Sequence, residues 1–148
     1  MKKKKVKVFV LLEGLNFGGQ QLMVYNLFNE LKNNNEIDQN AGYLFSGNED
    51  LSEKYNSVFN KVYNFHLHSK ENKIKSNPFR TIYRIFKIII KLKKDKFDVI
   101  LTNGIYTFFI GSLVSFFIPG IKHFRLIGGD LHRNEGFFHY NKILRFFL

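Results

Sequence analysis

Cysteine is absent from this chain of 148 residues. Its absence excludes disulfide scaffolds, thiolate metal sites, iron–sulfur clusters and cysteine nucleophiles, and it fits a reducing compartment. The sequence also contains no G-x-S-x-G elbow, no H-E-x-x-H pair and no P-loop pattern. No carboxylate pair has a spacing typical of acid–base catalysis. Any chemistry must therefore come from residues that the fold brings together.

Acidic residues are scarce, with 12 Asp and Glu against 23 Lys and Arg, which gives a formal net charge of +11. A charge of this sign favours an anionic partner: a phosphorylated substrate, a membrane surface or nucleic acid. Hydrophobic residues make up 45% and aromatic residues 17% of the chain, which excludes a disordered protein. The length predicts one domain, spanning residues 1–148.

Two apolar stretches need to be tested as targeting or membrane segments. The stretch after Lys2–Lys5 is interrupted by Lys7 and closed by Glu13, and no small-residue cleavage site follows, so a signal peptide is not expected. The uncharged stretch from Val99 to Ile121 is long enough to cross a bilayer. Its internal Asn-Gly and Pro-Gly pairs favour a strand, a turn and a buried helix instead.

Strand-like and helix-like segments alternate along the chain. We expect strands at 6–12, 41–45, 61–65, 98–102 and 123–127, and helices at 20–32, 49–60, 78–94 and 106–117, with a loop at 66–77 and another helix from Tyr140. On the helix at 106–117, Gly111 and Ser115 are expected to allow close packing on the sheet. This alternation predicts an α/β, Rossmann-like parallel sheet with helices on both faces.

Ligands of such sheets bind beyond the carboxyl ends of the strands, so the loops after Leu12, Thr102 and Ile127 are the candidate site. Gly18 and Gly19 lie between the first strand and its helix, where backbone N–H groups can meet a phosphate. A glycine-rich turn with no ligand is the alternative.

The other two loops carry polar side chains. Asn103 is placed either to hydrogen-bond a sugar hydroxyl or to cap the helix that follows it. After the fifth strand, Asp130 is a candidate to act on a hydroxyl proton, while His132 and Arg133 are candidates to meet phosphate or sugar. A capping Asp and solvated basic residues are the alternative for this segment.

Two histidines, His66 and His68, lie two residues apart in a polar segment. No third ligand has a suitable spacing, so we expect no metal site. The helix at 78–94 places Arg80, Arg84, Lys87, Lys91 and Lys94 opposite an apolar side made of Ile82, Ile85, Phe86, Ile89 and Leu92. This pattern fits a membrane-surface helix, and equally a helix docked on a sheet with a solvated face. Nucleic-acid binding is not expected, because no recognised binding motif accompanies the charge.

Several of these segments together resemble the N-terminal half of family 4 glycosyltransferases, which are retaining enzymes of GT-B fold. The matching segments are the strand at 8–12 with its loop at 14–20, the amphipathic helix that follows, and the strand with its Asn-Gly end at 96–104. At the end of the fifth strand many relatives carry a His, whereas this chain has Gly128, Gly129 and Asp130, with His132 farther on.

The resemblance implies that this half binds the acceptor, a lipid-linked sugar or a growing polysaccharide. It implies that Gly18 and Gly19 approach the diphosphate of a nucleotide-sugar co-substrate. With such an acceptor, we expect Asn103 and Arg133 to bind it and Asp130 and His132 to be the catalytic residues. No other cofactor and no metal are implied, and we expect a location in the cytoplasm or at the inner face of the membrane. A separate C-terminal half would hold most donor contacts, so the chain alone is predicted to be inactive.

Two other classes of function remain open. One is a non-catalytic, membrane-associated subunit of a split transferase, with 99–121 or the basic helix facing lipid. The other is a module that binds anions or nucleic acid. Vesicle binding and salt-dependent binding of oligonucleotides separate these classes.

Overall fold

A computed structural model describes residues 4–16, 18–46, 51–69 and 78–126. Strands and helices alternate in this part of the chain: β1 (Val6–Leu12), α1 (Gly19–Glu30), β2 (Ile37–Ser46), α2 (Ser52–Val58), β3 (Lys61–Ser69), α3 (Pro78–Asp95), β4 (Val99–Asn103), α4 (Ile105–Phe117) and β5 (Lys122–Arg125). The predicted alternation is confirmed.

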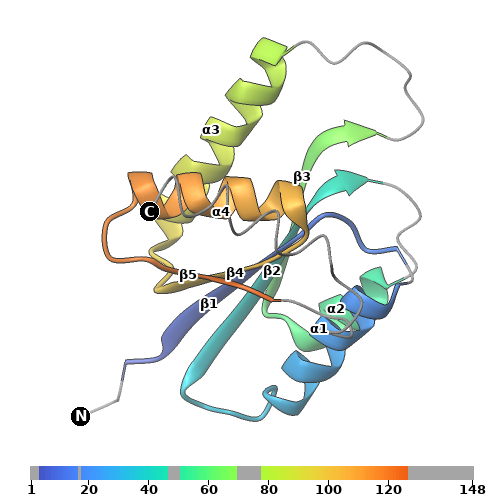
Figure 1. Ribbon diagram of the computed structural model, residues 1–148. Coiled ribbons are helices and arrows are strands. Elements are labelled where there is room, and N and C mark those ends of the chain that lie inside the picture. Colours follow the sequence, from blue (N-terminus) through green and yellow to red (C-terminus); the bar gives the residue numbers. More distant parts are fainter. Residues whose placement is uncertain (1–3, 17, 47–50, 70–77, 127–148) are drawn as a thin grey trace, which may run out of the picture.

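The strands form one parallel sheet with the order β3-β2-β1-β4-β5. From β1 the chain adds β2 and then β3 on one side, and α3 carries it back so that β4 and β5 are added on the other side (Figure 1). The direction of winding therefore reverses between β1 and β4. In doubly wound sheets this reversal is where ligands bind.

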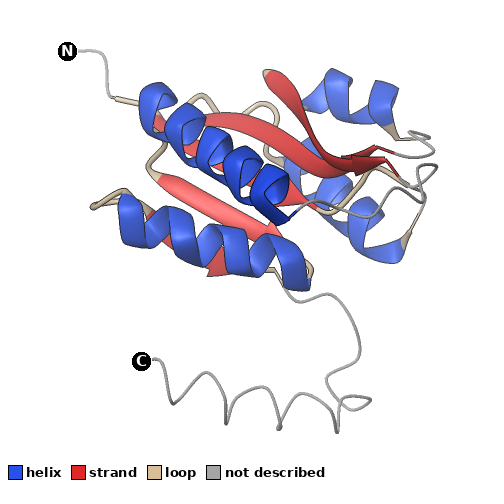
Figure 2. Cartoon of the chain, turned by 90° about the horizontal axis from the view of Figure 1, so that it is seen from above, coloured by secondary structure: helices blue, strands red, loops and turns tan. Residues whose placement is uncertain are grey.

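The sheet is covered on both faces, and the central strand β1 shows this best. Val8, Val10 and Leu12 belong to the core cluster that includes residues of α1 and α2. Phe9 and Leu11, between them in sequence, belong to the cluster that includes residues of α3 and α4. α3 and α4 lie on one side of the strands and α1 and α2 on the other (Figure 1), so that in the view from above helices lie both in front of the strands and behind them (Figure 2). The predicted Rossmann-like α/β sheet with helices on both faces is thus confirmed.

Two strands are longer than the sequence predicted. β2 begins at Ile37 rather than at residue 41, because polar Gln39 and Asn40 hid its first half. Gln39 is buried and its Nε2 donates to the carbonyls of Phe28 and Val58, at 3.2 and 2.8 Å, which satisfies the NH2 group of this amide inside the core, while its Oε1 has no hydrogen-bond partner among the described residues.

β3 continues to Ser69, so the loop predicted at 66–77 is wrong for residues 66–69. Its pairing with β2 resumes after a register shift, with Phe45 beside His68. Backbone hydrogen bonds to a neighbouring strand extend β3 irrespective of its polar side chains. β5 begins one residue earlier than expected, at Lys122, and ends at Arg125.

The uncharged stretch at 99–121 folds as β4, a turn at Gly104 and the 13-residue helix α4, as its Asn-Gly pair predicted. Within the described ranges, no helix combines the length and the apolar character needed to cross a bilayer. The helix expected from Tyr140 falls outside the described residues.

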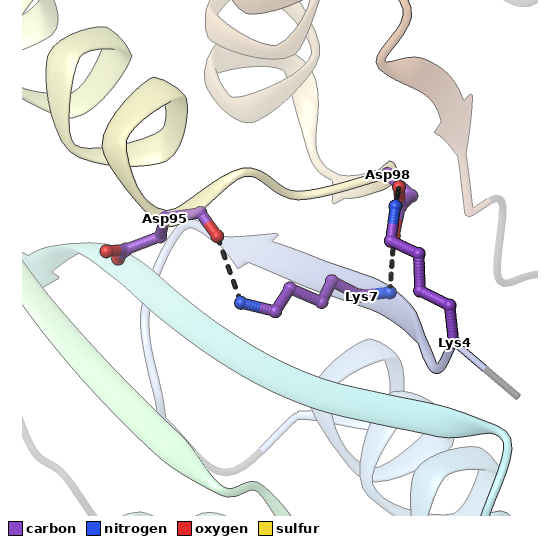
Figure 3. Close-up of polar contacts among 4 residues, drawn as sticks. All are labelled: Lys4, Lys7, Asp95 and Asp98. Carbon is purple, nitrogen blue, oxygen red and sulfur yellow. Dashed lines mark hydrogen bonds and ion pairs between the residues drawn. The ribbon is translucent and has the colours of Figure 1, made fainter. Parts of the chain in front are cut away.

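At the amino end of the sheet, β1 is fastened to the turn between α3 and β4. The Lys7 N–H donates to Asp98 Oδ2 at 2.9 Å, and Lys7 Nζ donates to the Asp95 carbonyl at 3.2 Å (Figure 3). Lys4 Nζ lies 3.4 Å from Asp98 Oδ1. These contacts help to set the register of β1 and β4, whose carboxyl ends form the candidate site.

Replacing Asp98 by Asn tests this fastening. The Lys7 N–H, helped by Lys4, lowers the pKa of the Asp98 carboxyl. Because the unfolded chain then binds its proton more tightly, the stabilisation is present above the ordinary carboxyl pKa and is lost as the pH falls through the lowered value. We expect D98N to reduce the free energy of unfolding by about 1 kcal/mol at neutral pH, since Asp98 is partly exposed.

Urea unfolding between acidic and neutral pH measures this effect, with the exposed Glu30→Gln on α1 as the control. The loss in D98N should shrink at acidic pH, where the parent's carboxyl is protonated. An equal loss at every pH would contradict the assignment.

Candidate functional site

The candidate site lies at the carboxyl ends of β1 and β4, where the winding of the sheet reverses. The last residues of the two strands, Leu12 and Asn103, are register partners. Each strand leads directly into a loop and then a helix: residues 13–18 precede α1, and Gly104 precedes α4. Both helices thus begin at this edge, so the N–H groups of their first turns are directed to it.

Neither Gly18 nor Gly19 is required by the fold. Gly18 caps α1 in an extended conformation, φ −159° and ψ 154°, which any residue adopts. A side chain at Gly18 would meet only the end of the flexible Gln21, and one at Gly19 would meet nothing within 4 Å. The first turn of α1 also has no acidic residue and no side-chain cap. The backbone here is therefore accessible to an anion.

Asn103 is buried, with 3% of its surface exposed, and its Nδ2 has no hydrogen-bond partner. Its register partner Leu12 belongs to the cluster on the α1 side of the sheet, so Asn103 lies on that side too. An unsatisfied buried amide costs roughly 1–3 kcal/mol, so a ligand atom that accepts a hydrogen bond from Nδ2 would relieve this cost.

Asn103 is not the cap of α4. The N-cap residue is Gly104, and the Tyr106 N–H donates to Glu13 Oε1 at 3.1 Å. Gly104 has φ +110°, and a side chain there would collide with Glu13. The capping alternative for Asn103 is wrong, because a carboxylate from the β1 loop takes that role.

The end of β5 adds a cation to this edge of the sheet. Arg125 lies with its guanidinium 5.4 Å from the centre of the Phe108 ring, and its buried Nε has no partner. On the side of the sheet that Arg125 faces, Thr102 Oγ1 is 2.9 Å from His123 Nε2. Burial lowers the pKa of His123, so the imidazole is neutral at pH 7.

The sequence alone did not indicate a role for Glu13 or Arg125. The only local signal was a charged residue at the end of a strand, which is common. Their significance depends on neighbours far along the chain, as in the contact between Glu13 and Tyr106.

The structure brings three of the predicted site residues, Gly18, Gly19 and Asn103, to one edge of the sheet. The other three, Asp130, His132 and Arg133, lie outside the described residues. All six roles stay predictions. His66 and His68 belong to β3, and the described residues contain no group of three side chains placed to hold a metal ion.

Comparison with known proteins bears on the fold. No family model and no curated protein matches the sequence. Among solved structures, the UDP-GlcNAc 2-epimerase from Neisseria meningitidis, bound to UDP-GlcNAc, matches with a TM-score of 0.55 over 86% of this chain, at 18% sequence identity. The chain has a GT-B-like Rossmann fold. It spans only 34% of the length of that enzyme. Membership of glycosyltransferase family 4 stays a prediction.

Proposed function

We propose that this chain forms the acceptor-side, N-terminal part of a glycosyltransferase that uses a nucleotide-sugar donor. The observation that carries the proposal is the structural similarity, over 86% of the chain, to an enzyme bound to UDP-GlcNAc. The complete enzyme would transfer a hexose, with retention and without a required metal, to a hydroxyl of a lipid-linked sugar or a polysaccharide.

The accessible N–H groups at Gly18 and Gly19 support a role in binding the donor diphosphate. Negative charge grows on the leaving diphosphate as the sugar bond breaks, and fixed N–H dipoles stabilise that charge without reorganising. The absence of an acidic residue from the first turn of α1 favours an anion at this place. A second domain would supply most contacts to the nucleoside.

Asn103 and the segment after β5 would serve the acceptor. The unpartnered Nδ2 of Asn103 is a donor suited to a sugar hydroxyl oxygen. In this proposal Asp130 accepts the proton of the attacking hydroxyl, His132 is the second catalytic residue, and Arg133 binds the acceptor.

A second candidate is part of a sugar-nucleotide epimerase, which the activity of the similar structure favours. Such an enzyme acts on one sugar nucleotide and needs no separate acceptor. Binding of oligosaccharides or lipid-linked sugars to the chain, in the absence of UDP, would support the transferase. Binding of UDP-GlcNAc alone, with no glycan bound, would favour the epimerase.

The purified chain is expected to bind UDP-sugars weakly and to turn over none of them. Ligand-observed NMR with UDP-GlcNAc and UDP-glucose measures the binding, and release of UDP measures turnover. Absence of binding would contradict the proposal, and rapid transfer or hydrolysis would contradict the need for a second domain.

Gly19→Ala separates binding from folding. We expect the free energy of unfolding to stay the same or to rise by about 0.5–1 kcal/mol, because alanine favours the helix and meets no neighbour. Affinity for the UDP-sugar should fall roughly tenfold, because the added methyl group keeps the diphosphate from approaching the backbone N–H and one charge-assisted hydrogen bond is lost.

Gly14→Ala is the matched control for Gly19→Ala. A side chain at Gly14, in the same loop, would make only an ordinary 3.5 Å contact with the Phe45 carbonyl oxygen, so affinity should not change. Parental affinity in Gly19→Ala would show that this glycine is only part of a turn.

A further inference from the structure

We propose that α3 and α4 together form a docking surface for an anionic membrane. The surface is an apolar ridge made of Phe79, Tyr83, Phe86 and Ile90 on α3 and of Phe116 and Phe117 on α4. Phe79 and Phe116 are each 80% exposed, and Ile90 is 63% exposed. Monomeric proteins rarely leave a continuous patch of this kind uncovered.

The ridge is additional to the apolar face that docks α3 on the sheet. Ile88, Ile89 and Leu92 are buried in the core and fill that role. The ridge residues of α3 follow one another at intervals of four, three and four, which places them on a second stripe of the helix. Docking on the sheet accounts for the first apolar stripe and does not account for the exposure of the second.

The two helices join into one surface. Both lie on the same side of the sheet (Figure 1), and the rings of Phe86 and Phe117 are 6.2 Å apart. Phe116 continues the surface, with its ring centre 5.2 Å from that of Phe117. A bilayer surface contacts both helices at once, whereas a single peptide helix in a groove would not need so broad a face.

The charges beside the ridge favour anionic lipid. Lys87, Lys91 and Lys94 form a stripe along α3, and Lys87 Nζ lies 4.8 Å from the centre of the Tyr83 ring. The sequences of α3 and α4 contain a single acidic residue, Asp95, and it is paired with Lys91 at 3.3 Å. Ammonium groups at this place meet lipid phosphates while the aromatic rings enter the interface.

A second copy of the chain fits this surface less well. Pairing two ridges would bring the lysine stripes of both copies together, and like charges repel. Neither helix meets the requirements for spanning a bilayer, so the contact is peripheral. The inference does not rest on the proposed transferase function, because the ridge uses none of the candidate site residues.

Co-sedimentation of the whole chain with vesicles tests the inference. We expect binding to vesicles that contain phosphatidylglycerol, little binding to pure phosphatidylcholine, and weaker binding as salt is raised. Lys87→Gln with Lys94→Gln should weaken binding roughly thirtyfold at low salt, since each lysine near the surface contributes about a factor of five to six. Phe79→Ser with Phe116→Ser should weaken it at least tenfold, through loss of apolar area.

Matched controls exist elsewhere on the molecule. Phe124 on β5 is 54% exposed and pairs with Leu101, which packs in the cluster on the other face of the sheet, so Phe124→Ser should bind like the parent. Lys32→Gln with Lys61→Gln removes two exposed charges away from the ridge. Circular dichroism confirms that each variant folds.

Three results would overturn the proposal. Equal binding to neutral and anionic vesicles would exclude the electrostatic part. Parental binding by the ridge variants would exclude the apolar part. A dimer in sedimentation velocity that the phenylalanine variants dissociate, with no vesicle binding, would assign the ridge to a second copy of the chain.

Discussion

Replacing Phe9 by Ala is expected to lower the free energy of unfolding by about 3–5 kcal/mol. Phe9 is fully buried in β1, the strand at the centre of the sheet. Its ring contacts three other aromatic rings, and the centre of the nearest, Phe97, is 4.9 Å away. Truncation leaves a cavity among side chains that are fixed by the sheet, so the site cannot collapse around it. Equilibrium unfolding in urea measures the loss.

The same substitution at Phe116 is the matched control. Phe116 is 80% exposed, so Phe116→Ala should change the free energy of unfolding by less than about 0.5 kcal/mol. Losses of similar size at both positions would contradict the division between core and exposed ridge.

The sequence could not make that division. It contains 18 Phe, and helical spacing placed Ile82 and Phe86 on one side of α3 together with Ile85, Ile89 and Leu92. In the structure Ile89 and Leu92 are buried, whereas Ile82 and Phe86 are 51% and 49% exposed. Which part of an apolar side reaches the core depends on how the helix lies on the sheet. Spacing within one helix carries no information about that orientation.

Gly111→Val is expected to destabilise the fold by about 2–3 kcal/mol. A Cβ at this position would lie 2.5 Å from His123 Nε2 and 2.6 Å from Thr102 Cγ2. Those two side chains are held together by their own 2.9 Å hydrogen bond, so neither moves away freely. The valine would push α4 off β4 and β5. The expectation that Gly111 allows close packing on the sheet is confirmed.

The pH dependence gives Gly111→Val a second readout. Burial lowers the pKa of His123, so the unfolded chain binds its proton more tightly. The parent should lose stability as the pH falls from about 6.5 towards the lowered value. Lifting α4 exposes the imidazole to water, so the variant should show a smaller loss over that range.

Ser115→Ala, one turn farther along α4, is the control. Its hydroxyl donates within the helix, to the Ser112 carbonyl, so the change should be within about 1 kcal/mol. A Gly111→Val variant as stable as the parent would show that α4 is not packed tightly on the sheet.

Much of the candidate site followed from the sequence, because the carboxyl ends of parallel strands always meet at one edge. A buried strand followed by Gly18 and Gly19, and a second strand predicted to end at Thr102, just before Asn103, were enough to place these residues together. The contact from Tyr106 to Glu13 joins residues 93 positions apart, and only the folded sheet brings them together. The length of β3 was missed for a similar reason, since its polar end is held by pairing with β2.

Amide chemical-shift mapping with UDP-GlcNAc tests the central claim most directly. We expect the perturbed amides to gather at the carboxyl edge of the sheet, at Gly18, Gly19 and Asn103, while Lys7 and Asp98 at the amino edge stay unchanged. A mixed-sequence oligonucleotide serves as a competitor for unspecific anion binding. Perturbations at the amino edge would contradict a site at the carboxyl edge. Perturbations that are spread over the exposed lysines and removed by the oligonucleotide would contradict it as well.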